Sequence, residues 1–350
     1  MDFLRRVLGL SSNASADTSP DKEAVIITPG SQTVLAGPPE PVIEAPPKAA
    51  APTETASKAP EEPVEVASPP VETAAMMVGT RPLPPLETII PQPGHRMIFG
   101  QLSDVGMVRG NNQDAMFGML SSGTSTDDLP DFGLFIVADG MGGHQEGERA
   151  SAITTRIVAK HVLDGIFMSL LSKEMGDPER PSIADVLRAA VQEANESVTE
   201  QIPEGGTTAT TTVILGDLAY IAHVGDSRAY LITDDRIEQV TRDHSLVQRL
   251  IELDQLTPEE AAEHPQRNVL YRAIGQSESL DVDAITRRLP PRSRLLLCSD
   301  GLWNMVSEDT IQEVVSRHSD PQEACNQLIR LANERGGPDN ITVILVQMPG

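Results

Sequence analysis

Three aspartates of this chain stand where an apolar segment begins or ends. Asp139 directly follows such a segment, Asp300 follows one after a single serine, and Asp339 stands two residues before one. The three apolar segments are residues 134–138, 295–298 and 341–346. A short apolar run bounded by turn residues is typical of a buried strand, so each carboxylate is expected at the rim of a sheet.

Two more aspartates have comparable positions. Asp226 lies in a turn between two apolar runs, and Asp114 follows the polar residues Asn111, Asn112 and Gln113. If the strand ends meet, these like charges repel one another strongly, because the dielectric constant of the interior is low. Divalent cations relieve that repulsion, and oxygen ligands without histidine or thiolate suit Mg²⁺ or Mn²⁺ better than zinc. The alternative is that each Asp–Gly pair only marks a turn.

The elements that must position these aspartates are predicted from apolar periodicity. Buried strands are predicted at residues 132–138, 210–215, 218–224, 228–232, 294–298 and 341–346. Helices are predicted at 151–163, at 182–198 behind a Ser182 cap, from a capping box at Thr257, and from Asp320 to the glycines at 336–337. Strands and helices are mixed without strict alternation, which favours an α+β fold over a doubly wound sheet.

The first 94 residues differ in composition from the rest of the 350-residue chain. They hold 17 of its 28 prolines but only one of its aromatic residues, Phe3. The burial of so few large apolar side chains cannot offset the entropy lost when a chain becomes ordered. Residues 1–94 are therefore predicted to be a disordered tail, followed by one domain at 95–350. Residues 1–10 have the spacing of a short amphipathic segment for weak membrane or partner docking, with a frayed terminus as the alternative.

Charge and hydropathy exclude several classes of protein. The net charge of −24 argues against general nucleic-acid binding, because phosphate contacts need clustered lysine and arginine. No apolar run reaches the ~18 residues of a transmembrane segment, and the first ten residues lack the apolar core of a secretory signal. Two cysteines cannot staple a chain of this size, so a reducing, cytoplasmic location is predicted.

A set of short motifs runs in order through the predicted domain. The motifs are residues 105–114, 137–144, 206–208, 225–228, 243–245, 298–303 and 339–342. Together they resemble the motifs of the metal-dependent PPM (PP2C-type) serine/threonine protein phosphatases, with the bacterial branch the nearest match. The resemblance implies a four-layer α-β-β-α sandwich, in which helices flank two packed antiparallel sheets. It also implies two Mn²⁺ or Mg²⁺ ions in a cleft at one end.

The same resemblance implies a role for each matching acidic residue. Asp139 would bridge the two ions, and the carbonyl group of Gly140 would bind one of them. Asp300 and Asp339 would hold the other ion. Asp226 matches the aspartate of a third, weaker ion in bacterial members.

The remaining implied roles concern the substrate. Arg109 matches the arginine that grips the phosphate, and Asp114 matches an acidic residue that supports the metal site through water. A water bridging the two ions would attack phosphoserine or phosphothreonine directly. A guanidinium suits the clamp because it binds two phosphate oxygens at once. The implied partners are phosphorylated proteins, a serine/threonine kinase among them.

Two residues depart from the family pattern. Gln113 stands where many members have glutamate, and Met141 replaces the histidine that protonates the leaving group in animal members. A thioether cannot donate a proton, so the proton must come from water on the Asp226 ion or from another residue. His144 is a candidate, with a local hydrogen-bonding role as the alternative. These departures motivate a second hypothesis, a phosphoprotein-binding module without turnover.

A third hypothesis is a structural Ca²⁺ site, which the lack of an Asp-x-Asp-x-Asp-Gly loop argues against. Residues 241–275 match the flap that borders the cleft in bacterial relatives. Arg267 and Arg272 of the flap could orient a partner, with solvated surface as the commoner role. His223 is predicted to be a strand residue rather than a metal ligand. The acidic domain is expected to attract basic phosphopeptides.

Overall fold

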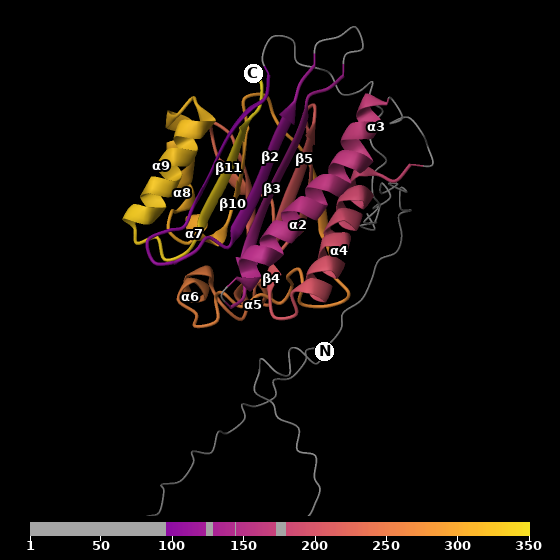
Figure 1. The fold of residues 1–350 in the computed structure, drawn as a ribbon. Coiled ribbons are helices and arrows are strands. Elements are labelled where there is room, and N and C mark those ends of the chain that lie inside the picture. The colour runs from indigo at the N-terminus through magenta and orange to yellow at the C-terminus, as the bar shows by residue number, and fades with distance from the viewer. Residues whose placement is uncertain (1–95, 124–128, 144, 173–179) are drawn as a thin grey trace, which may run out of the picture. The chain divides into compact units, whose positions relative to one another are not determined.

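The computed structural model describes residues 96–123, 129–143, 145–172 and 180–350. The predicted disordered tail and the docking segment at its start lie outside these ranges, as does His144. The described part contains two antiparallel sheets, packed face to face, with helices on both outer faces (Figure 1).

Each sheet has its own strand order. The first sheet runs β1 (Ile98–Asp104), β11 (Ile341–Gln347), β10 (Arg294–Cys298), β7 (Arg228–Ile232) and β8 (Ile237–Gln239). The second runs β2 (Asp114–Ser121), β3 (Phe132–Met141), β5 (Ala209–Leu215), β6 (Leu218–Val224) and β9 (Asp283–Arg288), and β4 (Gly206–Thr207) pairs with β3. The predicted buried strands are confirmed, and within each sheet every neighbouring pair is antiparallel.

Helices cover the outer face of each sheet. The six-stranded sheet carries α2 (Glu146–Val162), which continues through η2 (Leu163–Phe167) into α3 (Met168–Leu171), and α4 (Ile183–Gln201). The five-stranded sheet carries α7 (Asp300–Trp303), α8 (Glu308–Arg317) and α9 (Pro321–Glu334). Two short helices, α5 (Leu246–Glu252) and α6 (Pro258–Ala262), lie with β4 at one end of the sheets (Figure 1). The arrangement confirms the predicted four-layer α-β-β-α sandwich.

The central strands are buried on both faces, which explains their continuous apolar sequences. On β3, Phe132, Leu134 and Ile136 pack among the residues of α2 and α4. Phe135 and Val137 point the other way and pack between the two sheets. Because neither face of β3 meets water, apolar residues follow one another along it rather than at every second position.

The helix boundaries follow the predicted capping residues. The hydroxyl oxygen of Ser182 accepts a hydrogen bond from the amide of Asp185, and Thr257 and Glu260 form the reciprocal capping box. Asp320 accepts from the amide of Gln322 at the start of α9. Each cap satisfies an amide that the first helical turn leaves without a backbone partner.

Both cysteines, Cys298 and Cys325, are buried free thiols. Burial raises the pKa values of Cys298 and Cys325 to about 12, so neither is a reactive thiolate. Within the described ranges, none of the helices combines the length and the apolar character needed to cross a membrane.

Candidate metal centre

The predicted aspartates gather around Asp139. The register of β2 and β3 places Asp114 directly opposite Asp139. The carboxyl group of Asp139 is within hydrogen-bonding reach of those of Asp114 and Asp300. Asp226 and Asp339 lie near enough to repel it electrostatically. The fold therefore collects carboxylates from both sheets at one end of the sandwich.

Burial and mutual repulsion perturb these carboxyl groups. Both effects raise the pKa values of Asp139 and Asp300 well above the ordinary aspartate range. Burial also raises the pKa of Asp114 to about 6, although hydrogen bonds from two hydroxyl groups oppose the shift. Carboxyl groups gathered in this way can all be negatively charged only when cations compensate their charges.

The backbone of Asp139 is fixed by two threonines. The hydroxyl group of Thr207 and the amide of Thr208 both donate to the carbonyl oxygen of Asp139, at 2.8 and 2.9 Å. The amide of Asp139 donates in turn to the hydroxyl oxygen of Thr208 at 2.9 Å. Sequence reasoning assigned these threonines no role, although both belong to a matching motif. They explain why that motif accompanies a strand-end aspartate.

A serine joins the two sheets beneath Asp300. The Ser299 hydroxyl group donates to Asp114 Oδ2 at 2.8 Å and accepts from the amide of Thr342 at 2.9 Å. Gly301 approaches the carbonyl oxygen of Asn340 so closely that a Cβ atom there would clash. Asp300 therefore begins α7 at a fixed distance from Asp114, on a turn that requires glycine.

Arg109 lies on the loop between β1 and β2, beside Asp339. Its Nη2 donates to Asp339 Oδ2 at 2.7 Å, and this hydrogen bond raises the pKa of the guanidinium. The Arg109 side chain is 48% exposed. Solvent and a substrate can therefore reach it next to a predicted metal ligand, whereas its contact with phosphate stays a prediction.

Asn340 holds the two ends of this loop. Its Nδ2 donates to the carbonyl oxygens of Val105 and Asn111 at 2.9 and 3.0 Å. Its Oδ1 accepts from the amide of Gln113 at 2.8 Å. Asn340 is only 4% exposed and directly follows Asp339, so one segment positions the loop of Arg109 and its carboxylate partner together.

The turn that carries Asp226 is held by a buried charged pair. Trp303 Nε1 donates to the carbonyl oxygen of Asp226 at 3.0 Å, and the Arg228 guanidinium lies 3.7 Å from the Trp303 ring centroid. Arg228 also binds both carboxylate oxygens of Asp243. Burial and repulsion from Asp243 raise the pKa of Asp226 to about 7. Asp243 is a site-supporting residue that sequence reasoning missed.

Residues 241–275, the predicted flap, are tied to the rest of the domain near both ends. Thr207 and Ile274 exchange backbone hydrogen bonds of 3.1 and 2.9 Å. The amide of Gly225 donates to His244 Nδ1 at 3.1 Å. Arg272 forms ion pairs with Asp281 and Asp283 at 3.0 and 2.8 Å, and its docking role stays a prediction. The exposed Arg267 keeps that role as a prediction.

The donor set suits a hard divalent cation. Asp114 Oδ1 is buried and has no hydrogen-bond partner. Gly140 and Gly147 pack backbone to backbone, which leaves no room for a side chain at either position. All candidate ligands are oxygens, as Mg²⁺ and Mn²⁺ prefer. Among the described residues no three acidic, histidine or cysteine side chains are arranged as a metal-binding group.

Comparisons with known proteins agree with this geometry. The family model described as "Protein phosphatase 2C" matches residues 109–333. The chain is 37% identical over 253 residues to protein phosphatase PhpP of Streptococcus pneumoniae, and this match covers 72% of this chain and 98% of that protein. It is 35% identical over 251 residues to serine/threonine phosphatase stp of Listeria monocytogenes, covering 70% of this chain and 93% of that protein.

Solved structures of serine/threonine phosphatases are also similar to this chain. The serine/threonine phosphatase PstP/Ppp of Mycobacterium tuberculosis has a TM-score of 0.60 and 33% identity, covering 73% of this chain and 99% of that one. The catalytic domain of PstP in complex with two manganese ions has a TM-score of 0.58 and 32% identity, with the same coverage of 73% and 99%.

Proposed function

The chain belongs to the protein phosphatase 2C family, and we propose that it removes phosphate from serine and threonine side chains of proteins with the help of two divalent cations. The observation that carries this proposal is the group of clustered carboxyl groups around Asp139, which raise one another's pKa values. A relative named PstP that is solved with two manganese ions supports the metal dependence. A kinase among the substrates and a cytoplasmic location stay predictions.

Asp139 would be the central ligand, because its carboxyl group reaches both Asp114 and Asp300. The Gly140 carbonyl group would bind one ion, Asp300 and Asp339 the other, and Asp114 would support the site through water. Mn²⁺ or Mg²⁺ held there would activate a water molecule and neutralise charge on the phosphoryl group. The raised pKa values support these roles, because a bound cation would favour the charged form of each carboxyl group.

Arg109 would clamp the phosphate. Its guanidinium is exposed and forms an ion pair with Asp339 at 2.7 Å. If Asp339 turns toward a cation, the donors of Arg109 become available to two phosphate oxygens at once. The pairing would thus place the arginine correctly before substrate binds.

The leaving oxygen must receive a proton from a group other than Met141. His223 and His244 are 0% and 1% exposed, so neither can reach a substrate. Water held near Asp226, the position of the predicted third ion, is the donor that we propose. The alternative, His144, lies outside the described residues.

The test is hydrolysis of a phosphothreonine peptide by the full chain in the presence of Mn²⁺. EDTA should stop turnover, and Asp139→Asn should lower kcat/KM by about 100-fold or more, because it removes the central negative ligand. The exposed aspartate Asp309 on α8 offers the matched control, Asp309→Asn, which should be fully active. Turnover that persists without metal would disprove the mechanism, and Mn²⁺ binding without turnover would favour a binding module.

A further inference from the structure

Apolar side chains are exposed on the loop that carries Arg109. Val105, Met107 and Val108 are 36%, 69% and 71% exposed. Such a cluster is typical of a surface that contacts another molecule. Met107 precedes Arg109 by two residues, so the two Cα atoms are at most about 7 Å apart. A protein substrate whose phosphate meets Arg109 must therefore pass close to Met107.

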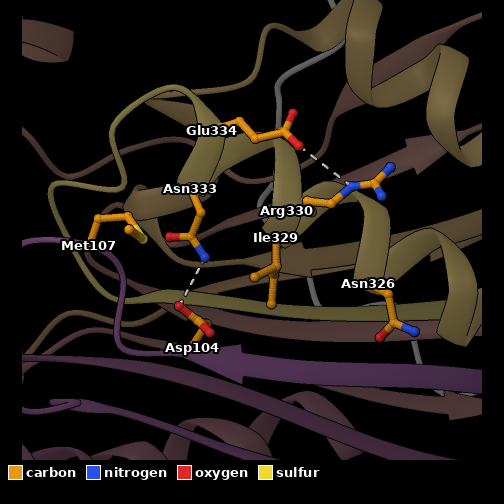
Figure 2. A pocket seen from close by; sticks show the side chains of 7 residues that line it. All are labelled: Asp104, Met107, Asn326, Ile329, Arg330, Asn333 and Glu334. Atoms are coloured by element: carbon orange, nitrogen blue, oxygen red, sulfur yellow. Dashed lines mark hydrogen bonds and ion pairs between the residues drawn. The ribbon is translucent and has the colours of Figure 1, made fainter.

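A groove of about 410 Å³ opens beside this loop, between Met107 and the second half of α9 (Figure 2). Ile329, which is 4% exposed, forms its floor. Asp104 lines one wall, where its Oδ1 accepts from Asn333 Nδ2 at 3.0 Å and from the amide of Gly106 at 2.8 Å. These contacts fix the direction of the Asp104 carboxylate at the groove wall.

The charges along the groove favour a cation. Asp104 and Glu334 are acidic, and Arg330 is the basic residue among those that line it. Arg330 Nε lies 3.8 Å from Glu334 Oε1, and both side chains are more than 60% exposed. An exposed pair of this kind contributes little free energy, so an incoming cation can replace Arg330 at Glu334.

We propose that this groove binds a lysine or arginine side chain of the phosphoprotein substrate, a few residues from the phosphorylated serine or threonine. The aliphatic part of such a side chain would lie on Met107 and Ile329. Its charged end would reach Asp104 and Glu334, as long basic side chains do when an apolar surface has an acidic rim. The inference rests on the proposed function and names a substrate feature that the metal centre alone does not select.

The test uses phosphothreonine peptides in which one lysine is moved along the sequence a position at a time. Each peptide is compared with its norleucine counterpart, which keeps the aliphatic chain and removes the charge. At one or two positions lysine should raise kcat/KM about threefold to fivefold at low ionic strength, the scale of an exposed ion pair. Equal kcat/KM values for lysine and norleucine at every position would overturn the proposal.

Variants then locate the preference in the groove. Met107→Ser combined with Glu334→Gln should remove most of it, whereas Glu323→Gln, at the other end of α9, should leave it intact. Hydrolysis of p-nitrophenyl phosphate should be unchanged in both proteins, because none of these side chains is a proposed metal ligand or the phosphate clamp. A lysine preference that survives the double change would overturn the groove assignment. Failure to hydrolyse any ester with Mn²⁺ would instead overturn the proposed function.

Discussion

His223 lies in β6, fully buried and surrounded by groups that keep its ring neutral. Its Nε2 is 3.0 Å from the carbonyl oxygen of Arg242, so this nitrogen carries the proton and donates it. Its Nδ1 is 3.0 Å from Thr210 Oγ1. Burial, with the neighbouring His244 ring, lowers the pKa of His223 to about 3. The structure confirms it as a strand residue, and its neutral state gives the fold a pH dependence.

Lowering the pH from 7 to 5 should reduce stability through His223. The unfolded chain takes up a proton on this imidazole below its ordinary pKa of ~6.5, whereas the folded protein does so only near pH 3, so stability rises with pH across that interval. The loss at pH 5 relative to pH 7 is about 2 kcal/mol. Urea unfolding of the wild type and of His223→Gln at both pH values measures it.

The comparison between these two proteins isolates His223 from the aspartates, which contribute with the opposite sign because their folded pKa values are raised. The variant should lose less stability than the wild type between pH 7 and pH 5. An identical loss in both proteins would show that the folded protein protonates His223 readily.

At the scale of elements, the loop between β1 and β2 depends on Asn340, which is more than 220 positions away in the sequence but in direct contact with the loop. Asn340→Asp keeps the shape and the acceptor for the amide of Gln113. It loses both donors and places a negative charge against the carbonyl oxygens of Val105 and Asn111. The free energy of unfolding of the variant should therefore be about 2–3 kcal/mol lower than that of the wild type, because buried acceptors are left unpaired. Amide hydrogen exchange in residues 105–113 should quicken in the metal-free protein.

The same change should act on catalysis through Arg109. In a double-mutant cycle on kcat/KM, Asn340→Asp should cost much less in an Arg109→Ala background than in the wild type. Asn326→Asp makes the same chemical change on the exposed face of α9 and should alter neither exchange nor the turnover of p-nitrophenyl phosphate, a substrate too small to depend on the groove that Asn326 lines. Additive losses in the cycle would contradict a role through the arginine loop.

The elements differ in how far the sequence predicts them. Strands such as β3 and β10, buried on both faces, were predicted nearly residue by residue, because their side chains are apolar throughout. The partly exposed β1 and β2 were missed, since glycine and polar residues interrupt their patterns. The four-residue α7 was missed because it is too short for a helical period.

At the scale of the whole molecule, the sequence placed the aspartates at strand ends but not beside one another. Their meeting depends on which strands pair and on how the two sheets stack. The β2–β3 register sets Asp114 opposite Asp139. The hydroxyl group of Ser299, the residue before Asp300, donates a hydrogen bond to Asp114. The Ser299–Asp114 contact joins residues 185 positions apart, so no local pattern encodes it. The matching motifs supplied that information through resemblance alone.

Deleting residues 1–94 should leave the catalytic unit intact. The buried apolar core is built from residues of the described domain. Met97, which is 2% exposed, is the first of these core residues along the sequence. The shortened protein should keep its Tm within about 2 °C, because the deletion removes none of those core side chains. Its turnover of p-nitrophenyl phosphate with Mn²⁺ should equal that of the full chain. A collapse of either quantity would mean that the domain begins before residue 95.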